Sequence, residues 1–115
     1  SKVDLKIDTD FTINGDLYYL SIALKNLIDN ALKYSIALPI IINIQKNRII
    51  IKNKGAKLKQ NLDYYTKPFT QELPQRNGFG LGLSIVIKIL EKHNFKLTYK
   101  YDKEYNIFIV NLQKS

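Results

Sequence analysis

Two asparagines and a lysine recur along one segment at a spacing that can build a site for phosphate and a metal ion. Asn26, Asn30 and Lys33 lie four and then three residues apart. At about 100° of rotation per helical residue, they fall within about 60° of one another on one helix face. An asparagine oxygen is a neutral, hard ligand suited to magnesium that phosphates already hold, and a lysine ammonium neutralises phosphate. An ordinary exposed polar face has the same composition, so both interpretations stay open here.

A glycine-rich turn is the second candidate. Gly78, Gly80 and Gly82 alternate with apolar residues where an irregular segment enters a helix. Glycines there permit positive φ and let backbone N–H groups approach an anion, and the helix N-terminus adds a partial positive charge. We expect a polyphosphate group as the ligand of this turn. The turn does not match a dinucleotide-binding loop, because the sequence of residues 74–77 does not predict a strand. It does not match a P-loop either, because Leu83 follows Gly82 where a P-loop has lysine. A purely structural glycine turn remains an alternative.

A third, weaker pattern is a run of isoleucines that ends in Asn53 and, two residues later, Gly55. A polar side chain at the end of a strand can hydrogen-bond the edge of a nucleobase, and the glycine leaves room for the ring. The pattern has no specificity by itself.

These residues must be positioned by a mixture of helices and strands. The pattern of residues 17–34 predicts a long amphipathic helix with Asp16 as its N-cap. Its apolar stripe, which includes Leu20 and Leu27, is centred about 120° around the helix from the polar face that carries Asn26, Asn30 and Lys33. Leu81 to His93 predicts a second helix.

The other segments predict strands, in adjacent pairs rather than in βαβ alternation. Strands are expected at residues 3–8, 11–13, 40–45, 48–52, 95–101 and 106–112, with a helical turn possible at 57–62 inside an irregular stretch from 53 to 77. The expected fold is α+β, a two-layer sandwich in which helices cover one face of a mixed, mostly antiparallel sheet.

Composition limits the remaining possibilities. The 115 residues are enough for one domain. The absence of cysteine excludes disulfides, and because the chain also has only one histidine, a transition-metal site is not expected. Any bound metal should therefore have oxygen ligands. The net charge of +8 comes from scattered lysines without a basic run, which favours a solvated surface over a nucleic-acid partner. No apolar run approaches the roughly 18 residues of a membrane span, so we expect no membrane contact by this domain.

Taken in this order and spacing, the three patterns resemble the catalytic ATP-binding domain of two-component sensor histidine kinases. Residues 26–35 resemble the family's N box, residues 78–86 its second glycine box, and residues 65–69 its F box, with Tyr65 in place of the first phenylalanine. The family shares a Bergerat-type ATP-binding fold with gyrase, Hsp90 and MutL, and the resemblance covers nearly the whole chain.

The resemblance implies roles for individual residues. Asn30 would ligate magnesium, Asn26 would lie close to the metal and phosphates, Lys33 would contact phosphate, and Tyr34 would line the adenine pocket; Asn26 and Lys33 are the catalytic candidates. Residues 66–78 would form a mobile lid. The implied ATP site also includes Asn53, Gly55, Leu58, Phe69, Arg76, Gly78, Gly80, Leu81, Gly82 and Leu83, with Arg76 either contacting the γ-phosphate or solvated at the surface.

Asn53 and Lys57 depart from the family pattern, and Asn26 differs from the wider superfamily. The resemblance puts Asn53 where the family has an aspartate that accepts a hydrogen bond from the adenine amino group, and Lys57 where it usually has a glycine. Loss of the charged acceptor at Asn53 should cost about 1 to 2 kcal/mol, so we expect ATP binding to be weaker by roughly tenfold or somewhat more. Asn26 stands where gyrase-like and Hsp90-like ATPases carry a glutamate. An amide is not a general base at neutral pH, which disfavours hydrolysis and favours phosphoryl transfer to an external nucleophile.

The resemblance also implies partners. The acceptor would be a histidine on a separate dimerisation domain of the same protein, and a response regulator would follow indirectly. His93 is expected to pack or cap at a helix end. We expect residues 1–115 to be one domain, monomeric in isolation and cut from a longer bacterial inner-membrane sensor with this domain in the cytoplasm. Two alternatives remain: a serine-type kinase of the anti-sigma class, and a degenerate module that binds nucleotide weakly or only docks a partner.

Overall fold

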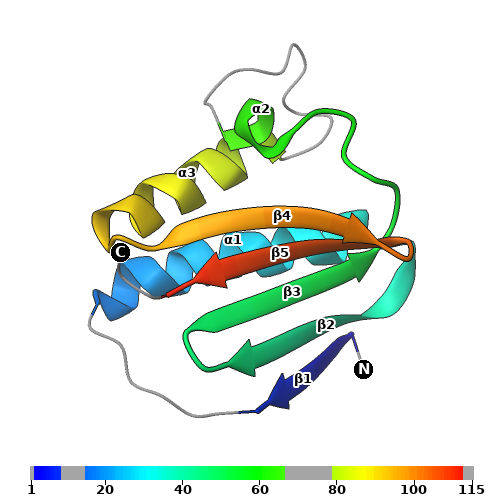
Figure 1. Ribbon diagram of the computed structural model, residues 1–115, viewed down its shortest axis with the longest axis horizontal. Coiled ribbons are helices and arrows are strands. Elements are labelled where there is room, and N and C mark those ends of the chain that lie inside the picture. Colours follow the sequence, from blue (N-terminus) through cyan, green and yellow to red (C-terminus); the bar gives the residue numbers. More distant parts are fainter. Residues whose placement is uncertain (1, 9–14, 67–78, 113–115) are drawn as a thin grey trace.

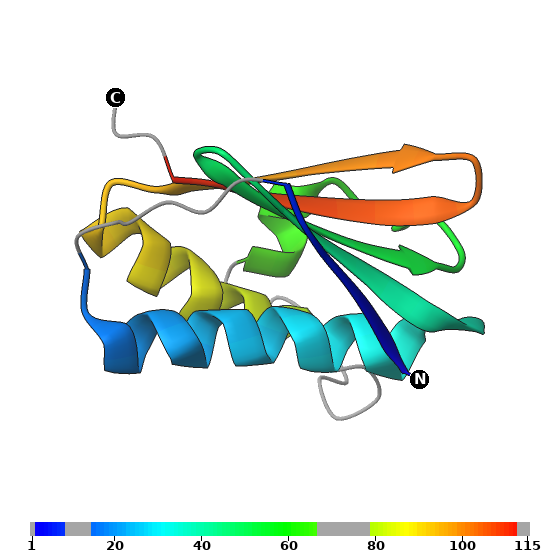
Figure 2. The same cartoon turned by 90° about the horizontal axis from the view of Figure 1, so that it is seen from below.

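The computed structural model describes residues 2–8, 15–66 and 79–112, with the side chains of 66 and 79–81 left out. A single sheet forms one layer, and the helices pack on one of its faces (Figures 1 and 2). The predicted α+β sandwich is confirmed. The described elements, in chain order, are β1 (Val3–Ile7), α1 (Leu17–Tyr34), β2 (Ala37–Gln45), β3 (Arg48–Lys54), α2 (Leu62–Thr66), α3 (Phe79–Lys92), β4 (Lys96–Asp102) and β5 (Tyr105–Asn111).

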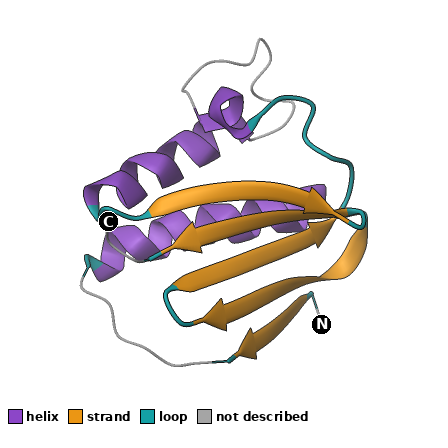
Figure 3. Cartoon of the chain, viewed as in Figure 1, coloured by secondary structure: helices purple, strands orange, loops and turns teal. Residues whose placement is uncertain are grey.

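The sheet has the strand order β1-β2-β3-β5-β4 (Figure 3). The β1–β2 pair is parallel and the other three pairs are antiparallel, as expected for a mixed, mostly antiparallel sheet. The register places Asn53 of β3 directly opposite Asn106 of β5. Since side chains alternate between the two faces of a strand, these two amides share the helix-covered face with Ile51 and Phe108.

Helix α1 has the bounds that its sequence predicts. Asp16 caps it, because its side chain accepts hydrogen bonds from the backbone N–H groups of Tyr18 and Tyr19 at 3.0 and 3.2 Å. His93 joins this cap to the end of α3: Nε2 lies 3.0 Å from the backbone nitrogen of Asp16, and Nδ1 lies 2.8 Å from the carbonyl oxygen of Ile89. The backbone N–H donates to Nε2, so Nδ1 carries the proton. The expected helix-end role of His93 is confirmed.

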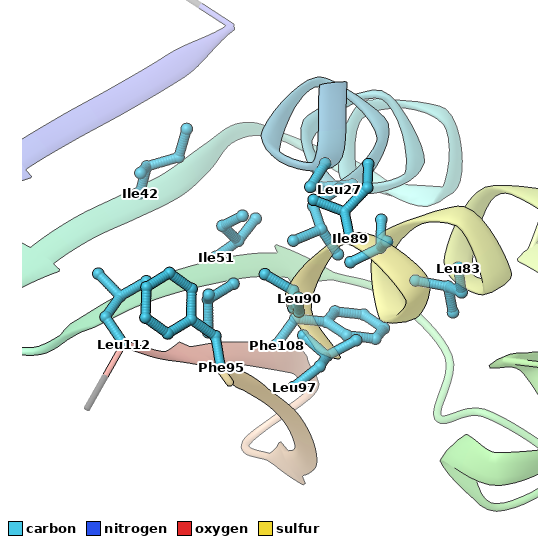
Figure 4. Packing of buried hydrophobic residues seen from close by; sticks show 14 of the residues in the cluster. Leu27, Ile42, Ile51, Leu83, Ile89, Leu90, Phe95, Leu97, Phe108 and Leu112 are labelled. Atoms are coloured by element: carbon cyan, nitrogen blue, oxygen red, sulfur yellow. The ribbon is translucent and has the colours of Figure 1, made fainter. Parts of the chain in front are cut away.

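The core lies between the helices and the sheet (Figure 4). Leu27 enters it from α1 and Leu90 from α3, and both pack toward Ile51 of β3 and Phe108 of β5. Full burial of each such side chain is worth about 1.5 to 3 kcal/mol. The polar face of α1 is therefore fixed in direction by the apolar face that the sheet covers.

Some predicted boundaries are wrong. The turn expected at 57–62 is not helical; the helix α2 lies at Leu62–Thr66 instead, with Asp63 in its first turn, where the helix dipole favours a carboxylate. Strand β2 begins three residues earlier than predicted, at Ala37, and contains the cis Leu38–Pro39 bond. Helix α3 begins two residues earlier, at Phe79. The strand expected at 11–13, and the lid apart from Thr66, lie outside the described residues.

Within the described ranges, none of the helices has the length and apolar character needed to span a membrane.

Candidate functional site

The polar face of α1 meets the first turn of α3. A Cβ atom added at Gly82 would lie 3.5 Å from Nδ2 and 3.8 Å from Oδ1 of Asn30, and 3.9 Å from Oδ1 of Asn26. Both asparagines are half-buried. The fold thus brings the N-box asparagines and the glycine segment into direct contact, although about fifty residues separate them in the sequence.

The two asparagines differ in their hydrogen bonding. Asn26 donates from Nδ2 to the carbonyl oxygen of Ile22, one helical turn earlier, at 3.0 Å. Nδ2 of Asn30 is buried and has no hydrogen-bond partner among the described residues. A buried polar group without a partner costs about 1 to 3 kcal/mol. The Asn30 amide is therefore available to a ligand in a way that the Asn26 amide nitrogen is not.

Lys33 and Tyr34 follow at the end of α1. The Lys33 side chain is exposed, and its Nζ lies 5.4 Å from the centroid of the Tyr34 ring, within cation–π range. Tyr34 is half-buried, and burial raises the pKa of its phenol. Because the Lys33 ammonium is exposed, it can reach an anion bound at the helix face.

A second amide without a partner lies at the end of β3. Asn53 is 3% exposed, and its Nδ2 has no hydrogen-bond partner in the part of the chain that the structure describes. A Cβ atom at the neighbouring Gly55 would lie 2.9 Å from the backbone carbonyl oxygen of Tyr34, closer than real Cβ contacts. Gly55 therefore lets the end of α1 approach the segment after β3, which places Tyr34 near Asn53.

The segment after β3 is held by side chains that sequence reasoning missed. The Tyr99 hydroxyl accepts a hydrogen bond from the backbone N–H of Leu58 at 3.2 Å and donates to Oδ1 of Asn106 at 2.5 Å. Asn106 in turn donates from Nδ2 to the carbonyl oxygen of Ala56 at 2.9 Å, and the Tyr101 hydroxyl donates to that of Gly55 at 2.9 Å. These bonds fix residues 55–58 against β4 and β5.

The environment of Tyr99 follows from this network. Burial raises the pKa of its phenol, and this outweighs the hydrogen bond from Leu58, which lowers it. The hydroxyl therefore keeps its proton and stays a donor to Asn106. One sequence signal could have found this pair: Asn106 interrupts an apolar strand two residues before Phe108, in the phase that faces the core.

The described part of the glycine-rich turn is already helical, whereas the sequence predicted a helix only from Leu81. Gly80 and Gly82 lie inside the first turn of α3, and none of the described glycines has a positive φ. The first N–H groups of any helix lack intrahelical partners, so this turn can still present donors to an anion. Here Gly82 serves close approach to Asn30, not an unusual turn conformation.

The structure describes the other predicted site residues to different extents. Leu83 is fully buried and belongs to the core, Leu58 is half-buried and held through its backbone, and Gly80 and Leu81 are described by their backbone alone. Phe69, Arg76 and Gly78 lie outside the described residues.

A large hollow among the described residues lies elsewhere. It measures about 610 Å³ and opens between the start of α1 and the end of α3, with Ile22, Ile85 and Ile89 in its wall. Its apolar wall contains none of the predicted site residues. The polar arrangement at the other end of the two helices is the better candidate for phosphate chemistry.

Sequence comparison identifies the family. Residues 15–114 match the family described as histidine kinase-, DNA gyrase B-, and HSP90-like ATPase. Sensor histidine kinase ArsS of Helicobacter pylori is 35% identical over 95 residues, which cover 81% of this chain and 22% of ArsS. Sensor protein RprX of Bacteroides fragilis is 33% identical over 121 residues, covering 90% of this chain and 22% of RprX. The chain thus spans about a fifth of the length of either relative.

Solved structures agree with this assignment. The catalytic domain of histidine kinase ThkA superposes with a TM-score of 0.77 at 26% identity, covering 98% of this chain and 80% of that one. Acinetobacter baumannii histidine kinase AdeS gives 0.73 at 26% identity, with 98% and 54% covered. The chain therefore resembles the catalytic domains of histidine kinases, and it belongs to the histidine kinase-, DNA gyrase B-, and HSP90-like ATPase family.

Proposed function

We propose that this domain binds magnesium-ATP between the polar face of α1, the first turn of α3 and the end of β3, and positions the γ-phosphoryl group for transfer to a histidine on another domain. One observation carries the proposal: two buried side-chain amides, those of Asn30 and Asn53, have donors without partners among the described residues. The nearby buried amide of Asn106, in contrast, is hydrogen-bonded through both its oxygen and its nitrogen. Two such unsatisfied donors in one domain are expected at a ligand site, where the ligand satisfies them.

The phosphate end of the site is built from α1 and α3. Asn30 would hold magnesium through its amide oxygen, a ligand type that magnesium accepts alongside phosphate oxygens and water. Bound there, magnesium would neutralise charge on the phosphates. Lys33 would contact phosphate, and the backbone N–H groups of Gly80 and Gly82 would face it, because Gly82 lies against Asn30 without an intervening side chain.

The base end of the site is built around β3. Asn53 would meet the edge of adenine with its buried amide, and Tyr34 would line the pocket from α1. Hydrogen bonds that Tyr99 accepts and that Tyr101 and Asn106 donate hold the segment 55–58 that borders it. Together these elements would orient the nucleotide, which supplies most of what phosphoryl transfer needs from a protein.

Transfer is favoured over hydrolysis by the chemistry of Asn26. Its amide occupies the position of a water-activating glutamate in related hydrolases, and its nitrogen is already bonded to Ile22. An amide does not remove a proton from water at neutral pH. The acceptor would therefore be a nucleophile brought from outside, a histidine on the dimerisation domain of the same protein.

The wider assignment follows from the relatives, several of which are named as sensor kinases. We propose that residues 1–115 form a single domain of a longer sensor protein of the bacterial inner membrane, located on its cytoplasmic side and monomeric in isolation. A response regulator would receive the phosphoryl group from the histidine.

Titration with ATP, with and without magnesium, tests the proposal. Asn30→Ala should abolish the magnesium-dependent part of ATP binding, because it removes the oxygen that would hold the metal. Lys6→Ala, on the distant strand β1, is the matched control and should bind like the parent. Equal, magnesium-dependent binding by the parent and Asn30→Ala would refute the site.

A further inference from the structure

Two buried side-chain amides lie at the end of β3, and they differ in how they are held. Asn53 and Asn106 lie opposite each other on neighbouring strands, and both are buried, with 3% and 5% of their surface exposed. Asn106 is fixed by Tyr99 and by the carbonyl of Ala56, so its amide has one orientation. The Asn53 amide has no hydrogen bond in the described ranges that would choose its orientation.

Space around the Asn53 amide permits either orientation. A Cβ atom at Gly55 would lie 3.4 Å from Nδ2 of Asn53 and 3.5 Å from Nδ2 of Asn106, so the glycine leaves both amides uncovered on that side. Rotation of the terminal amide by about 180° exchanges its donor and its acceptor, and this torsion is broad and roughly two-fold. Asn53 can therefore present oxygen or N–H₂ to the same ligand edge.

Purines divide into two classes at that edge. A 6-amino purine such as adenine offers a donor at position 6 and an acceptor at N1, whereas a 6-oxo purine such as hypoxanthine offers an acceptor at position 6 and a donor at N1. An amide matches the first class in one orientation and the second in the other. A carboxylate only accepts, so a carboxylate that faces position 6 accepts from the amino group of adenine and repels a 6-oxo group.

We infer that Asn53 makes the nucleotide site tolerant of 6-oxo purine nucleotides, so that magnesium-ITP binds with an affinity close to that of magnesium-ATP. The inference rests on the proposed function, in which Asn53 meets the base edge. Asn53 is here a specificity-determining residue: it sets which purines enter, while the phosphate end of the site stays the same for both.

Competition binding against a fluorescent ATP analogue, with magnesium-ATP and magnesium-ITP as competitors, tests the inference. For the parent chain, the two dissociation constants should agree within about tenfold. Asn53→Asp should raise the ratio of the ITP constant to the ATP constant by about tenfold or more, because the carboxylate gains the adenine amino group and repels O6; tenfold corresponds to about 1.4 kcal/mol. Asn53→Ala removes both groups and should weaken the two nucleotides by similar factors.

The outcomes are distinguishable. Two results overturn the inference and leave the proposed function standing: a ratio that Asn53→Asp leaves unchanged, or a parent chain that binds ITP more weakly than ATP by more than about tenfold. Binding of neither nucleotide overturns both. Thermal unfolding of each variant shows whether it is folded. If the buried carboxylate of Asn53→Asp prevents folding, unequal weakening of the two nucleotides by Asn53→Ala overturns the inference.

Discussion

Replacement of Gly82 by alanine should stabilise the domain while it weakens nucleotide binding. Gly82 lies inside α3, where glycine is less favourable than alanine by about 0.8 to 1 kcal/mol. The added Cβ would meet its nearest atom, Nδ2 of Asn30, at 3.5 Å, which is ordinary van der Waals contact. No neighbour has to move, so we expect a gain of about 0.5 to 1 kcal/mol and a melting temperature higher by about 4 °C.

Nucleotide binding should respond in the opposite direction. The new methyl group would lie between the first turn of α3 and the amides of Asn30 and Asn26, where the proposal places phosphate and magnesium. We expect the dissociation constant for magnesium-ATP to rise at least tenfold, as the loss of one hydrogen bond to a charged group already costs about 1.5 kcal/mol or more. Calorimetric titration measures the affinity, and thermal unfolding without nucleotide measures the stability.

Gly15→Ala is the matched control. Its Cβ would lie 2.5 Å from Cδ1 of Leu20 and 2.8 Å from Cδ2 of His93, so these side chains must shift. We therefore expect lower stability. Gly15 lies just before α1 and fifteen residues before Asn30, roughly 20 Å away, so we expect unchanged ATP affinity. Unchanged ATP affinity in Gly82→Ala would refute the phosphate site, and a lower melting temperature would refute the packing.

Four further predictions concern single side chains. Tyr99→Phe leaves the N–H of Leu58 and Oδ1 of Asn106 without a partner and should lower the unfolding free energy by about 1 to 3 kcal/mol in urea titrations. Burial raises the pKa of Tyr99 above its ordinary value of 10.0, so above that pH the folded state keeps a proton that the unfolded chain loses. The unfolding free energy should therefore fall as the pH rises above about 10, and it should fall less steeply in Tyr99→Phe. The isolated chain should show negligible ATP turnover, because Asn26 is not a base, and phosphate release near one per second would contradict this. Lys25→Ala breaks an exposed ion pair with Asp29 and should change the unfolding free energy by no more than about 0.5 kcal/mol.

The sequence predicted those elements whose periodicity is strong and local. Helix α1 follows from its apolar stripe and the cap at Asp16, and its bounds agree with the structure. Strand pairs were predicted to within a few residues because alternation marks them clearly. The predicted start of α3 was wrong because glycine, as at Gly80, is typical of loops. In the structure the first turn of α3 is helical, and Gly82 of this turn packs against α1.

The parts of the site that depend on distant contacts could not be predicted. Residues 55–58 have no periodicity, and side chains about fifty residues later in the sequence hold them, Tyr99 and Asn106 among them. The lack of partners for Asn30 and Asn53 is also a property of three-dimensional packing. Composition and spacing indicated that these residues can bind a nucleotide, and only the fold shows that their amides are buried with unsatisfied donors.

Side-chain amide resonances report directly on whether nucleotide satisfies the two buried donors. In a ¹⁵N-labelled chain, addition of magnesium-ATP should shift the N–H₂ signals of Asn30 and Asn53, because the ligand supplies their missing partners. The signals of Asn43 and Asn111, which bond within the sheet, should stay in place. Unshifted Asn30 and Asn53 signals at saturating magnesium-ATP would contradict the proposed site.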